Sequence, residues 1–291
     1  MTAASLILVL LAAVAHASWN LLLKRAADPE VFVWCLLVVA TVLLAPLGVA
    51  LLFFNSVDVT GLWFILATIA LHVLYFNLLA RGYAQGDLSL VYPVARGMGQ
   101  MLVPMLAVVF LDEKIEPLAI GGIAAIIGGI YTISWWGNFH QVLRSPLLFL
   151  RSAGMRYAVL TGLTIAVYSI VDKEGVGHVP PLLYMYFLSI GTAAVLAPYI
   201  LLHKGVEAVR IEWRANAVPI TIAGVLTFAA YGLVLTAFSI SRVSYVAPAR
   251  EVGIVIGVML GVFLLKEPFG RGRLLGSGFI VAGLAMIALS P

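Results

Sequence analysis

Two arginines lie where the sequence predicts the interior of a membrane. Arg96 is in the apolar stretch "LVYPVARGMGQMLVPMLAVVFLDE" at residues 90–113, and Arg250 has the matching place in "YVAPAREVGIVIGVMLGVFLLKE" at residues 245–267. A charged side chain within a membrane helix costs at least a few kcal/mol, so its default interpretation is functional. The planar guanidinium group suits two-pronged binding of a carboxylate or phosphate. We therefore expect both arginines to bind the acidic group of a solute.

Neighbouring polar residues extend this hypothesis and also supply its alternative. Tyr92, Arg96 and Gln100 are four residues apart, so on a helix they share one face, which we expect to line a cavity. The structural alternative is an ion pair, such as Arg250 with Glu251 or with a carboxylate on another helix. Glu251 itself is open between that pairing and a role in binding a proton or an amine.

Other polar residues are further candidates. His16, Asn20 and Lys24 are again four apart, near the beginning of the chain. His16 is a candidate cavity residue and, through its near-neutral pKa, a candidate proton relay, although a histidine in a span is often a packing residue. Asp172 and Lys173 are expected to form an interfacial pair at the end of a helix, and a site that binds the coupling ion is the alternative.

Aromatic residues occupy matching places in the two halves of the chain. Trp19 matches Tyr168, and Phe76 matches Tyr231. Such residues either line a pocket where two repeats meet or pack between helices. We include Trp19, Tyr168 and Tyr231 among the candidate substrate contacts.

Composition predicts an integral membrane protein. Hydrophobic residues make up 63% of the 291 residues and charged residues only 10%, with a mean hydropathy of +1.10, whereas soluble domains have about 25% charged residues. The single cysteine, Cys35, excludes an internal disulfide and a cysteine-rich metal site. We expect no cofactor, no nucleic acid and no cleaved signal peptide. The lipid bilayer is the expected surrounding.

The apolar runs do not alternate as the strands of a membrane barrel do, so they predict helices. A spanning helix needs about 20 apolar residues. Cutting the sequence at charged and Gly/Pro-rich breaks predicts ten spans, at residues 3–23, 31–54, 61–81, 88–111, 117–136, 156–172, 181–202, 216–239, 243–265 and 273–290.

The two halves of the chain are related by an internal repeat. At a constant offset of 154 residues, four residues of the first half recur in the second: Arg96, Glu113, Gly122 and Gly129 match Arg250, Glu267, Gly276 and Gly283. Five spans per repeat is an odd number, which predicts repeats of opposite orientation. We expect an all-α protein with one repeat at 1–137, a connecting loop at 138–155 and a second repeat at 156–291.

Two features of the repeats are expected to be structural. Glu113 and Glu267 end a span just before the next helix, where a carboxylate caps free N–H groups. Small residues spaced for close helix contact predict packing between the fifth and tenth spans or their neighbours. They are Gly121, Gly122, Ala125, Gly128, Gly129, Gly276, Gly278, Ala282 and Gly283.

The segments "S..YPVAR....LVPMLAVVFLDEKIEPLAIGGIAAIIGGI" and "SYVAPAR....GVMLGVFLLKEPFGRGRLLGSGFIVAGL" resemble the two halves of an EamA-type member of the drug/metabolite transporter superfamily. "WN...K" near the amino end fits too. The resemblance implies a ten-helix transporter but not its cargo, because the superfamily moves many solutes. The sequence departs from the common pattern in having arginine, rather than a small residue, after the prolines of the fourth and ninth spans. Some phosphate-handling relatives carry basic residues there.

We therefore expect a secondary active transporter that moves a small organic anion or zwitterion with a phosphate, phosphonate or carboxylate group. Alternating access, coupled to protons or to a counter-transported solute, is the expected mechanism. Alternatives with the same fold are an exporter of amino acids or drugs and a lipid flippase. A membrane enzyme is disfavoured because no reactive set of side chains is evident.

Charge placement predicts the orientation in the membrane. Twelve Lys and Arg residues fall in loops on one side and three in loops on the other, which places the first side in the cytoplasm and both termini outside. Several relatives have cytoplasmic termini, which favours the opposite orientation. We expect a monomer in the inner membrane of a bacterium.

Overall fold

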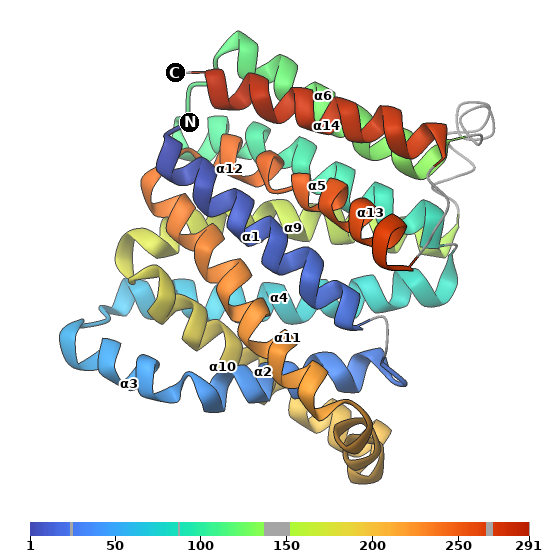
Figure 1. The fold of residues 1–291 in the computed structure, drawn as a ribbon. Helices are drawn as coiled ribbons and strands as arrows, with labels where there is room; N and C mark the ends of the chain where they lie inside the picture. The colour runs from blue at the N-terminus through green and yellow to red at the C-terminus, as the bar shows by residue number, and fades with distance from the viewer. Residues whose placement is uncertain (24–25, 87, 137–151, 266–269, 291) are drawn as a thin grey trace. The chain divides into compact units, whose positions relative to one another are not determined.

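The computed structural model describes residues 1–23, 26–86, 88–136, 152–265 and 270–290, and the regular structure of these residues is helical (Figure 1). The helices are α1 (Ala3–Leu23), α2 (Pro29–Leu43), α3 (Ala45–Phe54), α4 (Val59–Gln85), α5 (Leu88–Leu111), α6 (Pro117–Trp135), α9 (Ala153–His178), α10 (Pro181–Tyr199), the π-helix η1 (Ile200–Lys204), α11 (Val206–Ile240), α12 (Val243–Ala249), α13 (Val252–Leu265) and α14 (Arg271–Leu289). Lys24 and Glu267 lie outside the described residues.

The predicted all-α membrane fold is confirmed. Within the described ranges, nine helical stretches are long and apolar enough to cross a membrane, and α2 with α3 makes a tenth if this pair, bent by 52°, is one span. The bend follows Leu44, where Pro46 has no N–H to continue the helical hydrogen bonds. Two helices extend beyond their predicted bounds. The helix predicted at 156–172 runs on to His178, and the one predicted at 216–239 begins at Val206 and is kinked at Asn216.

The chain forms two compact units. Unit 1 contains Met1–Leu6, Leu74–Ile170 and Ser241–Pro291, and unit 2 contains Ile7–Val73 and Val171–Ile240. Each unit therefore draws segments from both predicted repeats. The inverted repeat itself stays a prediction.

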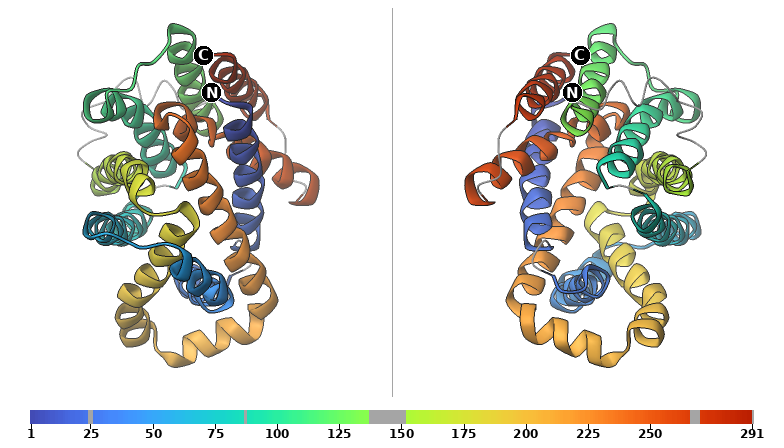
Figure 2. Two further views of the ribbon diagram at one scale, coloured as in Figure 1. Left: turned by 90° about the vertical axis from the view of Figure 1, so that its left-hand side faces the viewer. Right: turned by 90° about the vertical axis from the view of Figure 1, so that its right-hand side faces the viewer.

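In unit 1, α6 and α14 lie side by side along their lengths, as both figures show (Figures 1 and 2). Glycines make this closeness possible. A Cβ atom added at Gly122 would lie 2.6 Å from the carbonyl oxygen of Gly283, and one added at Gly129 would lie 2.6 Å from that of Gly276. The predicted contact between the fifth and tenth spans is confirmed.

Also in unit 1, Glu113 fixes the beginning of α12. Helix α5 ends at Leu111, and Asp112 follows in the left-handed region with φ of 50°, a conformation that asparagine and aspartate tolerate better than most residues. The Glu113 carboxylate then accepts hydrogen bonds from the N–H groups of Val243 (2.8 Å) and Ser244 (3.0 Å). Glu113 was expected to cap the next helix, α6. It caps α12 instead, because the chain turn aims its carboxylate at the free N–H groups there.

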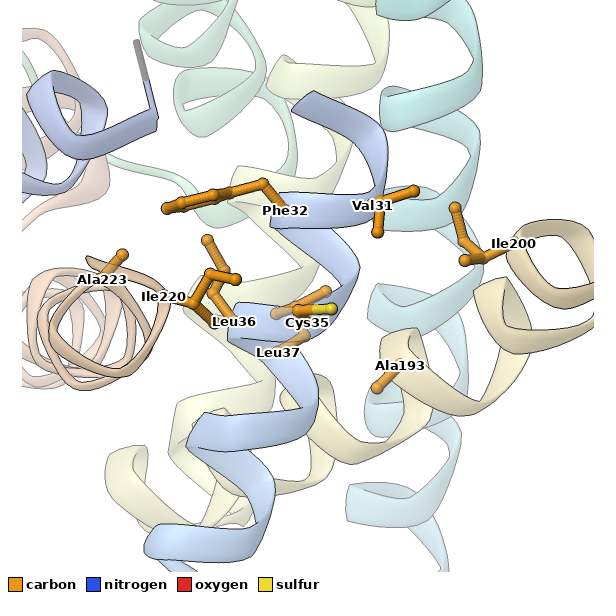
Figure 3. Close-up of a cluster of buried hydrophobic side chains, with 9 residues drawn as sticks. All are labelled: Val31, Phe32, Cys35, Leu36, Leu37, Ala193, Ile200, Ile220 and Ala223. Carbon is orange, nitrogen blue, oxygen red and sulfur yellow. The ribbon is translucent and has the colours of Figure 1, made fainter. Parts of the chain in front are cut away.

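In unit 2, one face of α2 forms the centre of an apolar core (Figure 3). Phe32 and Leu36 are four residues apart and therefore share a face of the helix. This face meets α10 and α11, which brings together Val31, Phe32, Cys35, Leu36, Leu37, Ala193, Ile200, Ile220 and Ala223. Helix α11 comes close enough for a Cβ atom added at Gly224 to lie 2.8 Å from the carbonyl oxygen of Leu36.

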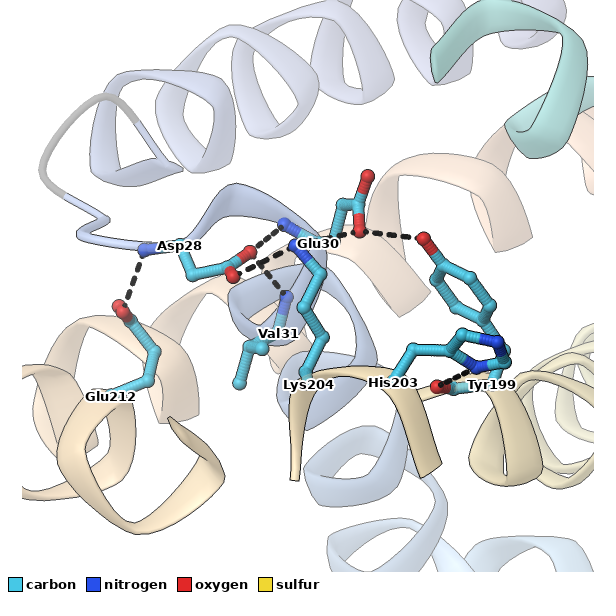
Figure 4. Close-up of polar contacts among 7 residues, drawn as sticks. All are labelled: Asp28, Glu30, Val31, Tyr199, His203, Lys204 and Glu212. Atoms are coloured by element: carbon cyan, nitrogen blue, oxygen red, sulfur yellow. Dashed lines mark hydrogen bonds and ion pairs between the residues drawn. The ribbon is translucent and has the colours of Figure 1, made fainter. Parts of the chain in front are cut away.

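A polar network holds the beginning of α2 (Figure 4). Asp28 caps the helix by accepting hydrogen bonds from the N–H groups of Glu30 (3.0 Å) and Val31 (3.3 Å). Lys204 lies 3.0 Å from the carboxylates of both Asp28 and Glu30. The buried carboxylate of Glu212 accepts from the Asp28 N–H at 3.0 Å. The network therefore ties α2 to η1 and α11 within unit 2.

These contacts set the proton affinity of Asp28. Burial alone would raise its pKa, but the hydrogen bond from Lys204 and those from the N–H groups of Val31 and Glu30 outweigh burial, so the pKa lies below 3.8. A carboxyl whose pKa is lowered by folding stabilises the folded state above its unfolded pKa. That contribution is lost as the pH falls through the folded pKa.

Glycine substitutions test the contact of α6 and α14. Gly122→Ala should lower the free energy of unfolding by about 1–3 kcal/mol, because the new methyl group meets a backbone oxygen that cannot move aside. Gly128→Ala is the matched control on the same helix, because no atom lies within 4 Å of its added Cβ. Denaturant titration of the purified protein measures both. Equal destabilisation by the two variants would contradict the predicted packing.

The variant Asp28→Asn tests the charge on the α2 cap. Asparagine still caps a helix but has no charge for Lys204, so we expect a loss of about 1 kcal/mol in the free energy of unfolding at neutral pH. The difference between native and variant should shrink as the pH falls below 3.8. Unfolding curves at several pH values measure it, and a difference that does not change with pH would rule out the ion pair as its cause.

Candidate functional site

The ninth predicted span is interrupted at the residues singled out in the sequence. Helix α12 ends at Ala249 and α13 begins at Val252, so Arg250 and Glu251 form the break. Across it the hydrogen bonds span three residues rather than four: the Glu251 N–H donates to Pro248 (3.0 Å) and the Gly253 N–H to Arg250 (3.1 Å). Tight turns of this kind within a helix often mark a functional hinge.

Arg96 and Glu251 form a two-pronged ion pair in unit 1. The Arg96 Nη2 atom lies 2.6 Å from Glu251 Oε1, and Arg96 Nε lies 3.3 Å from Oε2. Glu251 is completely buried and the Arg96 side chain is 11% exposed. An arginine on α5 thus holds a carboxylate that the break between α12 and α13 presents to it.

Gln100 completes this group, one helical turn after Arg96. Its Nε2 atom donates to Glu251 Oε1 at 2.8 Å, so the carboxylate accepts three hydrogen bonds from two side chains. Gln100 Oε1 is buried, and no donor among the described residues reaches it. A buried acceptor without a donor costs about 1–3 kcal/mol. One acceptor of this group, Gln100 Oε1, therefore lacks a hydrogen-bond donor among the described residues.

The other candidates in unit 1 are placed in different ways. Arg250 is partly buried at the break, directly before Glu251. Tyr168 is buried on α9, with its ring 6.0 Å from that of Tyr75. Tyr92 belongs to α5, but its side chain lies outside what the structure describes. Of the sequence candidates, the structure thus brings Arg96, Gln100 and Glu251 into direct contact.

The remaining candidates lie in unit 2. On α1, Trp19 Nε1 donates to His16 Nδ1 at 3.3 Å and Asn20 Nδ2 donates to the His16 carbonyl at 2.7 Å. These three residues therefore contact one another along one helix. Tyr231 on α11 donates its hydroxyl hydrogen to Asp172.

Asp172 was expected to be at a helix end, and this expectation was wrong. Helix α9 continues to His178, so Asp172 is buried and Lys173 donates to the Phe238 carbonyl at 2.5 Å instead of forming an interfacial pair. Tyr184, which was not singled out as a site residue, donates to Asp172 at 2.9 Å. The residues after Lys173 include Glu174, Gly175 and Gly177, so no apolar helical pattern in the sequence indicated that this helix continues.

Within the described ranges, no three His, Cys, Asp or Glu side chains are grouped so as to hold a metal ion.

A double-mutant cycle tests the buried ion pair. Arg96→Met should lower the free energy of unfolding by about 3–5 kcal/mol, because it leaves the Glu251 charge buried without its cation. Adding Glu251→Gln should restore part of this stability. The double variant should therefore lose less free energy of unfolding than the two single variants lose together. The exposed pair Arg210–Glu207, at 2.9 Å, is the control and should show little coupling. Additive losses at Arg96 and Glu251 would contradict the pairing.

Comparisons with known proteins agree with this architecture. Residues 152–289 match the EamA-like transporter family, and residues 32–126 match the Small Multidrug Resistance protein family. No curated protein matches the chain. A solved structure described only as "Crystal structure of protein" is 15% identical, with a TM-score of 0.70 over 99% of this chain and 98% of that one, which is a likeness of fold. Both matched families belong to one superfamily. Each match covers less than half of the chain, and together they show that two parts of the chain are similar to membrane transporters of this superfamily.

Proposed function

We propose that the chain is a secondary transporter of small zwitterions that carry a carboxylate, phosphate or phosphonate group, and that Arg96 binds this acidic group. The observation that carries the proposal is the two-pronged contact between Arg96 and Glu251. Glu251 already binds Arg96 as a solute carboxylate would, so the guanidinium is oriented for an acidic group. Glu251 acts as the internal substitute for the solute.

The burial of Glu251 favours a zwitterion over a simple anion. A solute that displaces Glu251 from Arg96 leaves a carboxylate with no exposed surface and no cation. The effective cost of such an isolated charge is several kcal/mol. A solute that brings its own ammonium group compensates for this, because the ammonium can take the place of the guanidinium on Glu251.

Gln100 supports the same conclusion. Its buried Oε1 atom has no donor among the described residues, and it belongs to the side chain that already contacts Glu251. An ammonium group has three N–H donors and no acceptor. It can therefore donate hydrogen bonds to Glu251 and to Gln100 Oε1 at the same time, which a simple anion cannot do.

The broken helix offers a means of coupling binding to movement. Glu251 lies at the break between α12 and α13, and transporters commonly build their binding sites at discontinuous helices. Exchange of Glu251 for the solute on Arg96 changes the contact between α5 and this break. We propose that this exchange accompanies alternating access, driven by a gradient of the solute, of a counter-transported solute or of protons.

The remaining sequence candidates stay proposed substrate contacts. They are Arg250, Tyr92, Tyr168, His16, Trp19, Asn20 and Tyr231. A monomer in a bacterial inner membrane, with both termini outside, also belongs to the proposal.

A matched set of solutes tests the charge requirement. We expect 2-aminoethylphosphonate or alanine to raise the melting temperature of the purified protein more than their partial analogues do, because a ligand that binds the native state stabilises it. Ethylphosphonate and propionate lack the amine, and ethylamine lacks the acid. Arg96→Met should abolish the shift, whereas Arg210→Met, at an exposed pair, should retain it.

The outcomes separate the parts of the proposal. Equal shifts for the zwitterion and the matching amine-free acid would remove the requirement for an amine. A full shift that persists in folded Arg96→Met would remove Arg96 from the binding site. Uptake of the bound solute into proteoliposomes then measures transport directly.

A further inference from the structure

A second buried carboxylate lies in unit 2 and has no part in the Arg96–Glu251 contact. Asp172, on α9, has no exposed surface. Tyr184 of α10 donates a hydrogen bond to its Oδ1 atom at 2.9 Å, and Tyr231 of α11 donates to its Oδ2 atom. Two phenol groups from two different helices therefore enclose one carboxyl group.

Asp172 differs from Glu251 in lacking a cation. In the part of the chain that the structure describes, no Lys, Arg or His nitrogen is paired with Asp172 within 4.0 Å. The next residue, Lys173, directs its ammonium to the carbonyl of Phe238 on α11. An ionised carboxylate that is buried without a cation is costly, and taking up a proton removes that cost.

The surroundings of Asp172 fit its protonated form as well as its ionised form. The Tyr184 hydroxyl has two acceptors in reach, Asp172 Oδ1 at 2.9 Å and the Phe64 carbonyl oxygen at 3.2 Å. It has one hydrogen, which it can give to only one of them at a time. When Asp172 is ionised, Tyr184 donates to Oδ1. When Oδ1 carries a proton, the carboxyl donates to the Tyr184 oxygen, and Tyr184 donates to Phe64.

In both states the hydrogens shared by Asp172, Tyr184 and Tyr231 have an acceptor among the described residues, and no heavy atom has to move far. Tyr231 keeps its hydrogen bond to Oδ2 throughout. The further titratable group near these phenols is His72 on α4, whose ring lies 5.5 Å from that of Tyr231 and whose Nδ1 atom is 2.9 Å from the Thr68 carbonyl. The groups that surround the carboxyl are therefore Tyr184, Tyr231, Lys173 and, one step away, His72.

We propose that Asp172 is a reversible proton-binding site of this transporter, with Tyr184 as the hydroxyl that changes its acceptor when the proton arrives. One proton is added to Oδ1, the charge of unit 2 rises by one, and no other bond to a heavy atom is made or broken. The coupling ion that this site would bind is a proton. It does not depend on which solute Arg96 binds.

Infrared spectroscopy of the purified protein during a pH titration tests this proposal without any solute. We expect the difference spectrum between the native chain and Asp172→Asn, which has nearly the same shape, to contain the C=O band of one carboxylic acid that appears as the pH is lowered. Glu251→Gln is the matched control and should keep this band. Proton uptake after a step to lower pH should fall by one proton per chain in Asp172→Asn.

Tyrosine variants make the test specific for the geometry. Tyr231→Phe should move the carboxylic acid band to higher frequency, because the Oδ2 carbonyl loses its hydrogen-bond donor. This variant also serves if Asp172→Asn does not fold. A difference spectrum without a titrating carboxylic acid band would overturn the proposal. A band that does not move in Tyr231→Phe would overturn it as well.

Discussion

The fold depends on how a chain with a lipid-facing exterior accommodates charge in its interior. Arg96 is always ionised, and neither lipid nor an apolar core compensates its charge. Glu251 does so with two contacts, and Gln100 adds a third hydrogen bond to the same carboxylate. The residue that compensates Arg96 thus lies at the interruption between α12 and α13.

The surrounding elements hold that feature in position. Helices α5 and α12 both contact α6, which packs against α14 through facing glycines. Glu113, just beyond α5, binds the first N–H groups of α12. The beginning of α12 is therefore tied to the end of α5, while the ion pair joins the same two segments farther along. Two connections at separate points fix the orientation of the break relative to α5.

Sequence patterns predicted the spans, the glycine contact and the shared face of Arg96 and Gln100, because these follow from local periodicity. They did not identify Glu251 as the partner of Arg96, because that contact joins residues 155 positions apart and depends on tertiary packing. The burial of Asp172 was not predicted for a different reason. Lys173 resembled the end of a helix, but α9 continues to His178, and the Lys173 ammonium donates to the carbonyl of Phe238 on α11.

The two buried carboxylates, Glu251 and Asp172, differ in the groups that surround them. Glu251 is compensated by Arg96, whose guanidinium is a permanent cation. Asp172 is enclosed by neutral phenols, which can serve either of its protonation states. Glu251 is therefore suited to exchange with the acidic group of a solute on Arg96, and Asp172 is suited to bind and release a proton. A transporter that uses both would bind the acidic group of its cargo at Arg96 and a proton at Asp172.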